Sequence, residues 1–202
     1  MTDAPTIDPM TDHLLTPANA ALVIIDYQPV QVSSVASMDR RAMVENITAV
    51  ARMAKLYGLP VVLSTVNVAT GVNKPTIHQI ADQFPEVEPI DRTTLNAWEN
   101  PRVRAAVKAT GRHKLIMCAL WTEVCLAFPA LSALHEGYEV YPVVDAVGGT
   151  SLTAHKAGLR RIEQAGARPV SWTQLICELQ RDWARKATVP AFAEILFAVE
   201  GA

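Results

Sequence analysis

The sequence predicts an α/β fold, a mainly parallel sheet with helices on both faces. Three observations indicate it: apolar runs of strand length alternate with stretches of helical periodicity, glycine follows several of those stretches, and polar side chains close the apolar runs. Half of the 202 residues are hydrophobic, which is enough for one large buried core. We therefore expect a single domain over residues 1–202, with right-handed crossovers between its strands.

The first half of the chain begins the alternation of strand and helix. After an irregular segment at residues 1–15, we expect a strand at Ala20–Ile25 that is closed by Asp26. This run is apolar without interruption, as in strands that are buried on both faces. A helix from about Met43 to Tyr57 and a strand at Leu59–Val66 follow.

A proline-rich connection comes next, and its length is typical of an active-site wall. It runs from Val68 to Pro89 and contains a short helix around Thr76–Phe84. The remaining elements are expected in this order: an extended piece at Glu88–Arg92, a helix from Pro101 to about Thr110, a strand at Leu115–Ala119, a helix after Cys125 that stops at Gly137, a strand at Glu139–Val144, a helix from about Leu152 to Ala165, a short strand at Pro169–Ser171 and a helical segment at 172–202.

Composition argues against several classes of function. The formal net charge is −2 with both signs interspersed, which disfavours a nucleic-acid partner and a polybasic membrane anchor. No apolar stretch reaches the ~20 residues that span a bilayer, and the polar start lacks the regions of a signal peptide. We expect a cytoplasmic protein that acts on a small molecule and keeps its three cysteines, Cys118, Cys125 and Cys177, as reduced thiols.

Cys125 lies where the strand at Leu115–Ala119 gives way to a helix. The first turn of a helix offers unpaired N–H groups and the positive end of the helix dipole, so we expect the thiolate to be favoured over the thiol. Asp26 follows the first strand, and ligands of such sheets bind beyond the carboxyl ends of the strands. If the two strands are neighbours, Asp26 accepts the thiol proton and Arg92 supplies the cation that holds the pair charged.

These residues resemble the isochorismatase-like cysteine hydrolases, whose catalytic set is Asp, Lys and Cys. The segment ALVIIDYQ is similar to the family's strand-end aspartate motif, and LWTEVCLAFPALSALHEGYEVYPVVDA is similar to its nucleophile motif. Together with DRTTLNAW and CELQRDW, these segments resemble the YcaC-like branch. The resemblance covers about residues 14–190 and implies a three-layer α/β/α sandwich around a doubly wound sheet.

The resemblance implies a metal-independent cysteine hydrolase for a small amide-like or related substrate, without a cofactor. It places the general base at Asp26, the nucleophile at Cys125 and a cis peptide bond at Leu120–Trp121, beside an oxyanion hole made by N–H groups of Trp121 or its neighbours and of Cys125. Arg92 stands where most of the family has lysine, so it can pair with a carboxylate but cannot shuttle a proton. The family also implies a homo-oligomer, from a dimer up to an octamer.

Other residues complete the candidate site. Nicotinamidase-type members carry a histidine cluster after the second strand, where this chain has only His78, so we expect no metal. Lys74 is the alternative cation, whereas Lys114 should lie at the opposite edge of the sheet. Trp98 and Trp121 either line the substrate pocket or fill the core. The full prediction for the pocket is Gln28, Asn96, Trp98, Trp121 and Thr122.

Several alternatives stay open. We expect Cys118 and Cys177 to lie in the core, and Asp145 to have a structural role at the end of its strand. Glu123 either accepts a backbone hydrogen bond or contacts another subunit. The segment VPAFAEILFAVE near the end of the chain is apolar, and we expect it to pack on a neighbouring chain. The second candidate function is a small-molecule-binding or scaffold protein that has lost hydrolysis, and the third is thiol redox chemistry.

Overall fold

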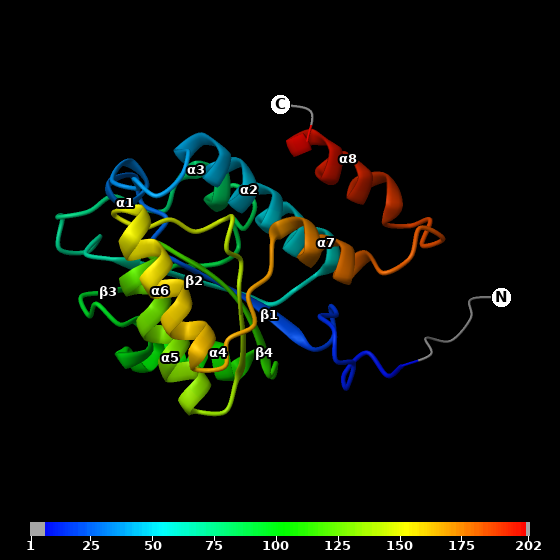
Figure 1. The fold of residues 1–202 in the computed structure, drawn as a ribbon, viewed down its shortest axis with the longest axis horizontal. Coiled ribbons are helices and arrows are strands. Elements are labelled where there is room, and N and C mark those ends of the chain that lie inside the picture. The colour runs from blue at the N-terminus through cyan, green and yellow to red at the C-terminus, as the bar shows by residue number, and fades with distance from the viewer. Residues whose placement is uncertain (1–6, 201–202) are drawn as a thin grey trace.

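The computed structural model describes residues 7–200, which form a five-stranded sheet between two layers of helices (Figure 1). All neighbouring strands are parallel, in the order β3-β2-β1-β4-β5, so the predicted α/β fold with a parallel sheet is confirmed. No helix of this part of the chain is long and apolar enough to cross a membrane. The strands are β1 Ala20–Ile25, β2 Val61–Val66, β3 Ile90–Arg92, β4 Lys114–Ala119 and β5 Glu139–Pro142.

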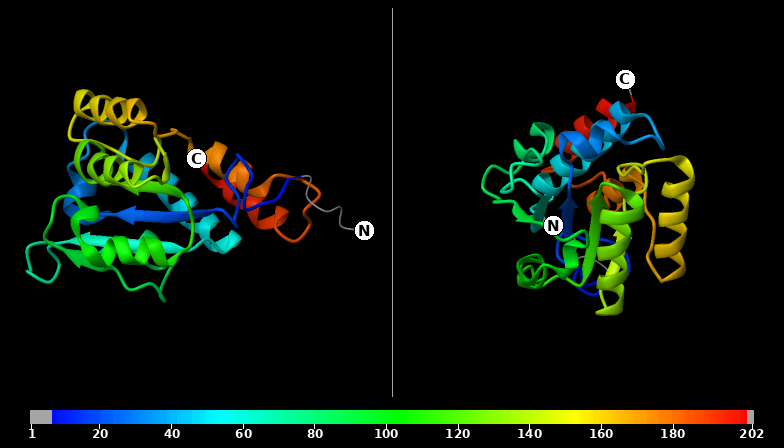
Figure 2. Two further views of the ribbon diagram at one scale, coloured as in Figure 1. Left: turned by 90° about the horizontal axis from the view of Figure 1, so that it is seen from below. Right: turned by 90° about the vertical axis from the view of Figure 1, so that its left-hand side faces the viewer.

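Helices cover both faces of the sheet, as two further views show (Figure 2). The helix α2 packs with α3, α7 and α8 on one side, whereas α4 and α5 lie on the other side with α6 against α5. The helices are α1 Pro29–Ser33, α2 Arg40–Tyr57, α3 His78–Ala81, α4 Pro101–Ala109, α5 Ala127–His135, α6 Leu152–Gln164, α7 Trp172–Gln180 and α8 Val189–Glu200, with a 3-10 turn η1 at Ala97–Glu99 and a π-helical turn η2 at Thr122–Leu126.

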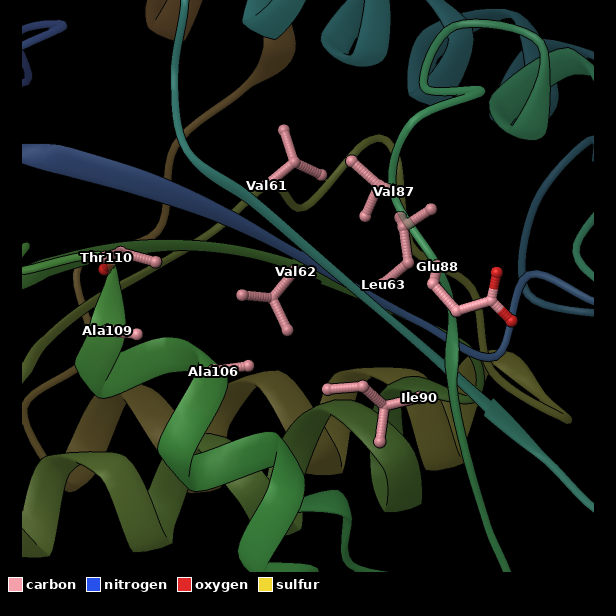
Figure 3. Close-up of a pocket in the computed structure, with 9 residues that line it drawn as sticks. All are labelled: Val61, Val62, Leu63, Val87, Glu88, Ile90, Ala106, Ala109 and Thr110. Atoms are coloured by element: carbon pink, nitrogen blue, oxygen red, sulfur yellow. The ribbon is translucent and has the colours of Figure 1, made fainter.

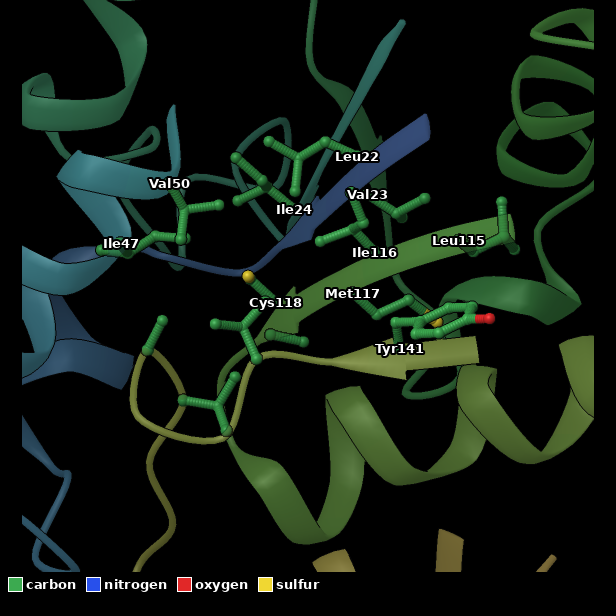
Figure 4. Close-up of a cluster of buried hydrophobic side chains, with 14 of the residues drawn as sticks. Leu22, Val23, Ile24, Ile47, Val50, Leu115, Ile116, Met117, Cys118 and Tyr141 are labelled. Atoms are coloured by element: carbon green, nitrogen blue, oxygen red, sulfur yellow. The ribbon is translucent and has the colours of Figure 1, made fainter. Parts of the chain in front are cut away.

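The central strand β1 forms the middle of the core. All six of its residues are buried because helices cover it on both sides. It pairs with β2 and β4, so that Ile25 lies opposite both Ser64 and Ala119. Figure 4 shows Cys118 of β4 within the apolar cluster that also contains Ile24 and Ile47, which confirms the core position predicted for this cysteine.

The strand order reverses beside β1, and this reversal locates the functional end of the sheet. From β1 the chain adds β2 and β3 on one side, and it then returns to place β4 and β5 on the other. Ligands of open parallel sheets bind beyond the carboxyl ends of the strands at such a switch point. Asp26 follows β1 and the turn η2 follows β4, so the topology brings both to this point.

Some predicted boundaries differ from those in the structure. The second helix begins at Arg40 rather than near Met43, because Asp39 caps it by accepting the Ala42 N–H. The short helix α1 has no counterpart in the sequence prediction. The strand β5 ends at Pro142, which has no N–H for the ladder, and the strand expected at Pro169–Ser171 is reduced to a single bridge between Val143 and Val170.

The start of the chain is bound to the amino-terminal end of the sheet. Of the irregular segment expected at residues 1–15, residues 1–6 lie outside the described residues, and the rest forms turns. Lys114 Nζ donates to the carbonyl oxygens of Asp12, His13 and Leu14 at 2.6, 3.0 and 3.0 Å. Lys114 therefore lies at the end of the sheet opposite Asp26, as predicted.

The end of the chain packs mainly on its own domain. Helix α8 lies against α2 and α7 and buries Phe192, Ile195 and Leu196 within this chain, and packing of the segment on a neighbouring chain stays a prediction. Phe197 remains exposed on the other face. Cys177 of α7 is also exposed, which corrects the core position predicted for it. Residues 201–202 of the predicted helical segment lie outside the described residues.

Candidate active site

A buried ion pair lies at the carboxyl ends of β1 and β3. Arg92 Nη2 donates to Asp26 Oδ2 at 2.6 Å, and neither side chain has solvent-exposed area. Arg92 Nη1 also donates to the Thr94 carbonyl oxygen at 2.9 Å. The alternative cation, Lys74, is exposed. The structure thus pairs Asp26 with Arg92, as the sequence predicts, and it does so across the intervening strand β2.

Asp26 leaves β1 in a left-handed backbone conformation, with φ of 61°. Aspartate is one of the few residues that is enriched in this region. Its N–H still donates to the Ser64 carbonyl oxygen of β2 at 2.9 Å. Oδ1 makes no hydrogen bond of normal geometry with any described residue. One carboxylate oxygen is therefore held by Arg92, and the other is left for a proton.

Cys125 lies in the π-helical turn η2, before the first residue of α5, and is only 7% exposed. Burial and the Asp26 carboxylate raise the pKa of its thiol to about 12, against the opposing influence of Arg92. The prediction that the position favours the thiolate is therefore wrong for the resting site. The cause is that an apolar environment and a facing carboxylate both disfavour a second negative charge.

The pKa of the Asp26 carboxyl is shifted in the same direction as that of the Cys125 thiol. Burial raises its pKa, although the positive charge of Arg92 and the interaction with Cys125 oppose this rise. The carboxyl and the thiol thus interact and titrate as a pair. With one proton on this pair, the three side chains have no net charge. Transfer of that proton from the thiol to Asp26 leaves the sum unchanged, so it adds no net charge to the buried site.

The peptide bond between Leu120 and Trp121 is cis, at the position that the family resemblance implies. Three N–H groups of the following turn are already used. The Thr122 N–H donates to the Gly148 carbonyl oxygen at 2.9 Å, and those of Val124 and Leu126 donate to the Trp121 carbonyl oxygen at 3.1 and 3.2 Å. Trp121 and Cys125 as donors to an oxyanion stay a prediction.

Gln28 has a structural role, and the pocket role predicted for it stays a prediction. It is fully buried, and its side-chain amide is bound to backbone on both sides. Nε2 donates to the carbonyl oxygens of Val66 and Lys74 at 3.1 and 2.6 Å, and Oε1 accepts the Val66 N–H at 3.0 Å. Gln28 therefore fastens the proline-rich connection to the end of β2.

Asn96 and Trp98 belong to a hollow of about 380 Å³ beside α5 whose lining does not include the ion pair or the thiol. Asn96 Oδ1 accepts the Trp98 N–H at 3.0 Å, and its Nδ2 donates to Ser132 Oγ at 3.1 Å. The Trp98 ring packs edge-on against Tyr138, with centroids 5.5 Å apart. Of the two roles left open for Trp98, the structure favours core packing.

Trp121 and Thr122 lie directly beside the cis bond, and both are anchored. Trp121 is half-buried and its Nε1 donates to Ser34 Oγ at 2.9 Å. Thr122 is fully buried, and its hydroxyl shares a hydrogen bond with His155 Nδ1 at 2.8 Å, while its place in the pocket stays a prediction. The sequence reasoning missed His155. Its position could have revealed it, because His155 lies in the first turn of the helix that follows β5.

Two acidic residues near the site have structural partners. Glu123 Oε1 accepts hydrogen bonds from the N–H and the hydroxyl of Thr150 at 2.9 and 2.6 Å, which is the first of the two roles left open for it. Asp145 Oδ1 accepts the Trp172 N–H at 2.9 Å, as a structural role requires. Among residues 7–200, no three His, Cys, Asp or Glu side chains gather where they could hold a metal ion.

A second hollow of about 380 Å³ lies at the outer edge of the sheet, between β2, β3 and α4 (Figure 3). Aliphatic side chains such as Val62 and Ile90 line most of it, with the carboxylate of Glu88 beside them. It contains no cysteine or histidine. Neither hollow has Asp26, Arg92 or Cys125 in its lining.

Comparison with known proteins identifies the class. The isochorismatase domain model matches residues 20–174, and the chain belongs to this family of hydrolases. Within the family it is similar to the probable hydrolase YcaC of Escherichia coli K12, with 39% identity over 166 residues, or 82% of this chain and 79% of the relative.

Two solved structures of YcaC agree with this assignment. YcaC from Pseudomonas aeruginosa matches with a TM-score of 0.83 and 34% identity over 95% of this chain and 99% of the other. YcaC from Escherichia coli, described as an octameric hydrolase of unknown specificity, matches with the same TM-score and identity over 94% of this chain and 98% of the other. The fold is therefore the three-layer isochorismatase fold that the sequence predicts.

We predict that the Cys125 thiol lowers stability at alkaline pH. An unfolded chain ionises this thiol near pH 9.0, whereas the folded site does so at about 12. In between, the unfolded state binds fewer protons, so the free energy of unfolding falls as pH rises, by at most ~1.4 kcal/mol per pH unit. Urea unfolding at about pH 8 and about pH 11 should show a larger loss for the wild type than for Cys125→Ala. Equal losses would contradict the raised pKa.

Proposed function

We propose that this chain is a metal-independent cysteine hydrolase that acts on a small amide-like or related substrate. Cys125 is the nucleophile, Asp26 the general base and Arg92 the permanent cation. The observation that carries the proposal is the buried Asp26–Arg92 pair that interacts with the Cys125 thiol at the switch point of the sheet. Membership of a hydrolase family supports it independently.

In the first half of the reaction, Asp26 takes the thiol proton and the Cys125 sulfur attacks the carbonyl carbon of the substrate. Backbone N–H groups of Trp121 and Cys125 receive the oxyanion, and one such donor typically contributes about 10²–10³-fold in rate. Asp26 then returns its proton to the leaving amine or alcohol as that bond breaks. The acyl group remains on Cys125 as a thioester.

In the second half, Asp26 takes a proton from water as the water oxygen attacks the thioester carbon. The C–S bond breaks, the carboxylic acid leaves, and Asp26 returns the proton to the sulfur. Arg92 stays charged throughout because guanidinium does not lose its proton near neutral pH. The site therefore ends with the same single proton with which it began, ready for another substrate.

A finding on a relative supports a reactive thiol. The YcaC structure from Pseudomonas aeruginosa contains hexane-2,5-diol and covalent acrylamide. A thiolate adds to the β-carbon of acrylamide while the α-carbon takes a proton, so an adduct of this kind reports a nucleophilic sulfur. Acrylamide is also a small neutral amide. It is therefore a suitable probe for Cys125 while the natural substrate is unidentified.

The first prediction concerns the nucleophile and its base. Cys125→Ala should abolish acrylamide addition at this position and hydrolysis of any substrate found in a panel of small amides and esters. Asp26→Asn removes the proton acceptor and should slow both by about 10²-fold or more. Intact mass and peptide mapping measure the adduct, with Cys177→Ala as the matched thiol control. Hydrolysis at the wild-type rate by Cys125→Ala would refute the mechanism.

The second prediction separates the charge of Arg92 from its geometry. Arg92→Lys keeps the charge and should retain adduct formation within about tenfold. Arg92→Met leaves Asp26 buried without its partner and should lower the free energy of unfolding by about 3–5 kcal/mol, with loss of reactivity. Arg104→Met, which breaks an exposed pair with Glu136, serves as the control and should cost less than about 1 kcal/mol. An equal effect of both methionine substitutions would contradict this role.

We also propose that the chain forms a homo-oligomer, because the similar YcaC of Escherichia coli is described as octameric. Large apolar side chains that a subunit contact would cover are exposed on this chain, among them Val72, Leu95 and Trp183. Light scattering should give a mass of several chains, whereas the mass of one chain would contradict the proposal. The single-domain organisation and the cytoplasmic location stay predictions.

A further inference from the structure

The turn that carries Cys125 is held from outside by residues with no role in the proposed mechanism. The Thr122 N–H donates to the Gly148 carbonyl oxygen at 2.9 Å, and the Thr122 hydroxyl shares a 2.8 Å hydrogen bond with His155 Nδ1. The carboxylate of Glu123 accepts two hydrogen bonds from Thr150. All of these partners come from the β5–α6 connection or from the first turns of α6, so η2 is fastened to the segment that follows β5.

Two glycines show how closely this segment approaches the turn. A Cβ atom on Gly158 of α6 would lie 2.9 Å from Glu123 Cα, and one on Gly149 would lie 2.4 Å from Glu123 Oε2. Real Cβ atoms do not approach so closely, so a side chain at Gly158 would force the backbone of η2 or α6 to shift, whereas one at Gly149 would displace the end of the Glu123 side chain. The contact leaves η2 little room to move toward α6. The hydrogen bonds of Thr122 therefore act on a turn that is already confined on one side.

The π-helical turn also has anchors at both of its ends. π-helical turns are rare and occur frequently at functional sites. The N–H groups of Val124 and Leu126 donate to the carbonyl oxygen of the cap residue Trp121, and the Ala127 N–H donates to that of Thr122. Trp121 Nε1 is bound to Ser34 Oγ at 2.9 Å. The turn thus closes with its own backbone bonds, and the side-chain bonds of Thr122 and Trp121 fix where it lies relative to neighbouring segments.

We propose that His155 and Thr122 form a positioning pair, in which the imidazole holds the Thr122 hydroxyl and thereby fixes η2 and the direction of the Cys125 sulfur. The inference rests on the proposed role of Cys125 as the nucleophile. His155 itself touches no reacting atom, so it acts through the turn. A thiol displaced by about 1 Å loses on the order of 10²-fold in rate, which makes a single buried hydrogen bond consequential here.

The local environment suits His155 for this role. Burial lowers the pKa of its imidazole, with Glu123 opposing this effect and Lys156 adding to it, so the ring is neutral near neutral pH. A neutral imidazole has one nitrogen that accepts and one that donates, and either can satisfy a hydroxyl. Thr122 is fully buried, and a buried hydroxyl that loses its partner is left unsatisfied. Loss of the His155 ring would therefore leave the Thr122 hydroxyl without the partner that it has in the structure.

The test compares substitutions that remove the hydrogen bond with substitutions that keep it. Thr122→Val has nearly the shape of threonine without the hydroxyl, whereas Thr122→Ser keeps the hydroxyl. His155→Leu removes the ring nitrogens, whereas His155→Asn keeps a polar atom near the place of Nδ1. The measurement is the rate of acrylamide addition at Cys125, followed by peptide mapping, with His135→Leu as an exposed-histidine control.

The other two cysteines serve as controls within the same experiment. Exposed Cys177 is an internal reference for reagent and time, and buried Cys118 reacts only if the fold opens. We expect Thr122→Val and His155→Leu to slow addition at Cys125 by about tenfold or more. Thr122→Ser and His155→Asn should restore a rate near that of the wild type, with Cys118 protected in every variant.

Each adverse outcome has one meaning. An unchanged rate at Cys125 in Thr122→Val and His155→Leu, with Cys118 still protected, overturns the positioning role and leaves the proposed function intact. If Cys118 becomes reactive in one of these variants, that substitution has opened the fold. The rate of addition at Cys125 in the other variant then tests the positioning role. Failure of the wild-type Cys125 to react at all would instead count against the proposed function. The two ideas therefore fail separately.

Discussion

The ion pair between Asp26 and Arg92 is the interaction on which the rest of the site depends. It joins the central strand β1 to the edge strand β3, and both charged groups are fully buried. Burying either charge without its partner would cost several kcal/mol of folding free energy. Each charge therefore depends on the other for its place in the core. In the proposed mechanism, the pair also gives Cys125 both a proton acceptor and a fixed positive charge. Burial alone would leave this cysteine an inert core thiol, as it does Cys118.

Hydrogen bonds between loops connect the segments around this pair. The β5–α6 connection is the common partner: the Tyr27 hydroxyl donates to the Ala146 carbonyl oxygen at 2.6 Å, and Ser37 Oγ accepts the Gly149 N–H at 2.9 Å. The same connection binds η2 through Thr122. One segment thus links the loop after β1, which follows the base, to the turn after β4, which carries the thiol.

The sequence was informative where a local pattern carries the signal. Continuous apolar runs revealed the buried strands, and with them the two strand ends where Asp26 and Cys125 lie. It was uninformative where partners meet only after folding. Gln28 binds backbone far along the chain, and Thr122 and His155 are 33 residues apart, so no local sequence pattern indicates these contacts. The raised pKa of the Cys125 thiol depends on burial and on a carboxylate from another strand, so a dipole argument from one helix could not reveal it.

Arg92 is the last residue of β3, a strand of three residues that pairs on one side only, with β2. Asp26, by contrast, follows a six-residue strand that is paired on both sides. Short edge elements exchange with open states more readily than central strands. Fraying of this edge would withdraw the cation from the buried carboxylate while the central strands stay paired. A loss of activity on heating would then precede global unfolding, with β3 rather than the core as the sensitive element.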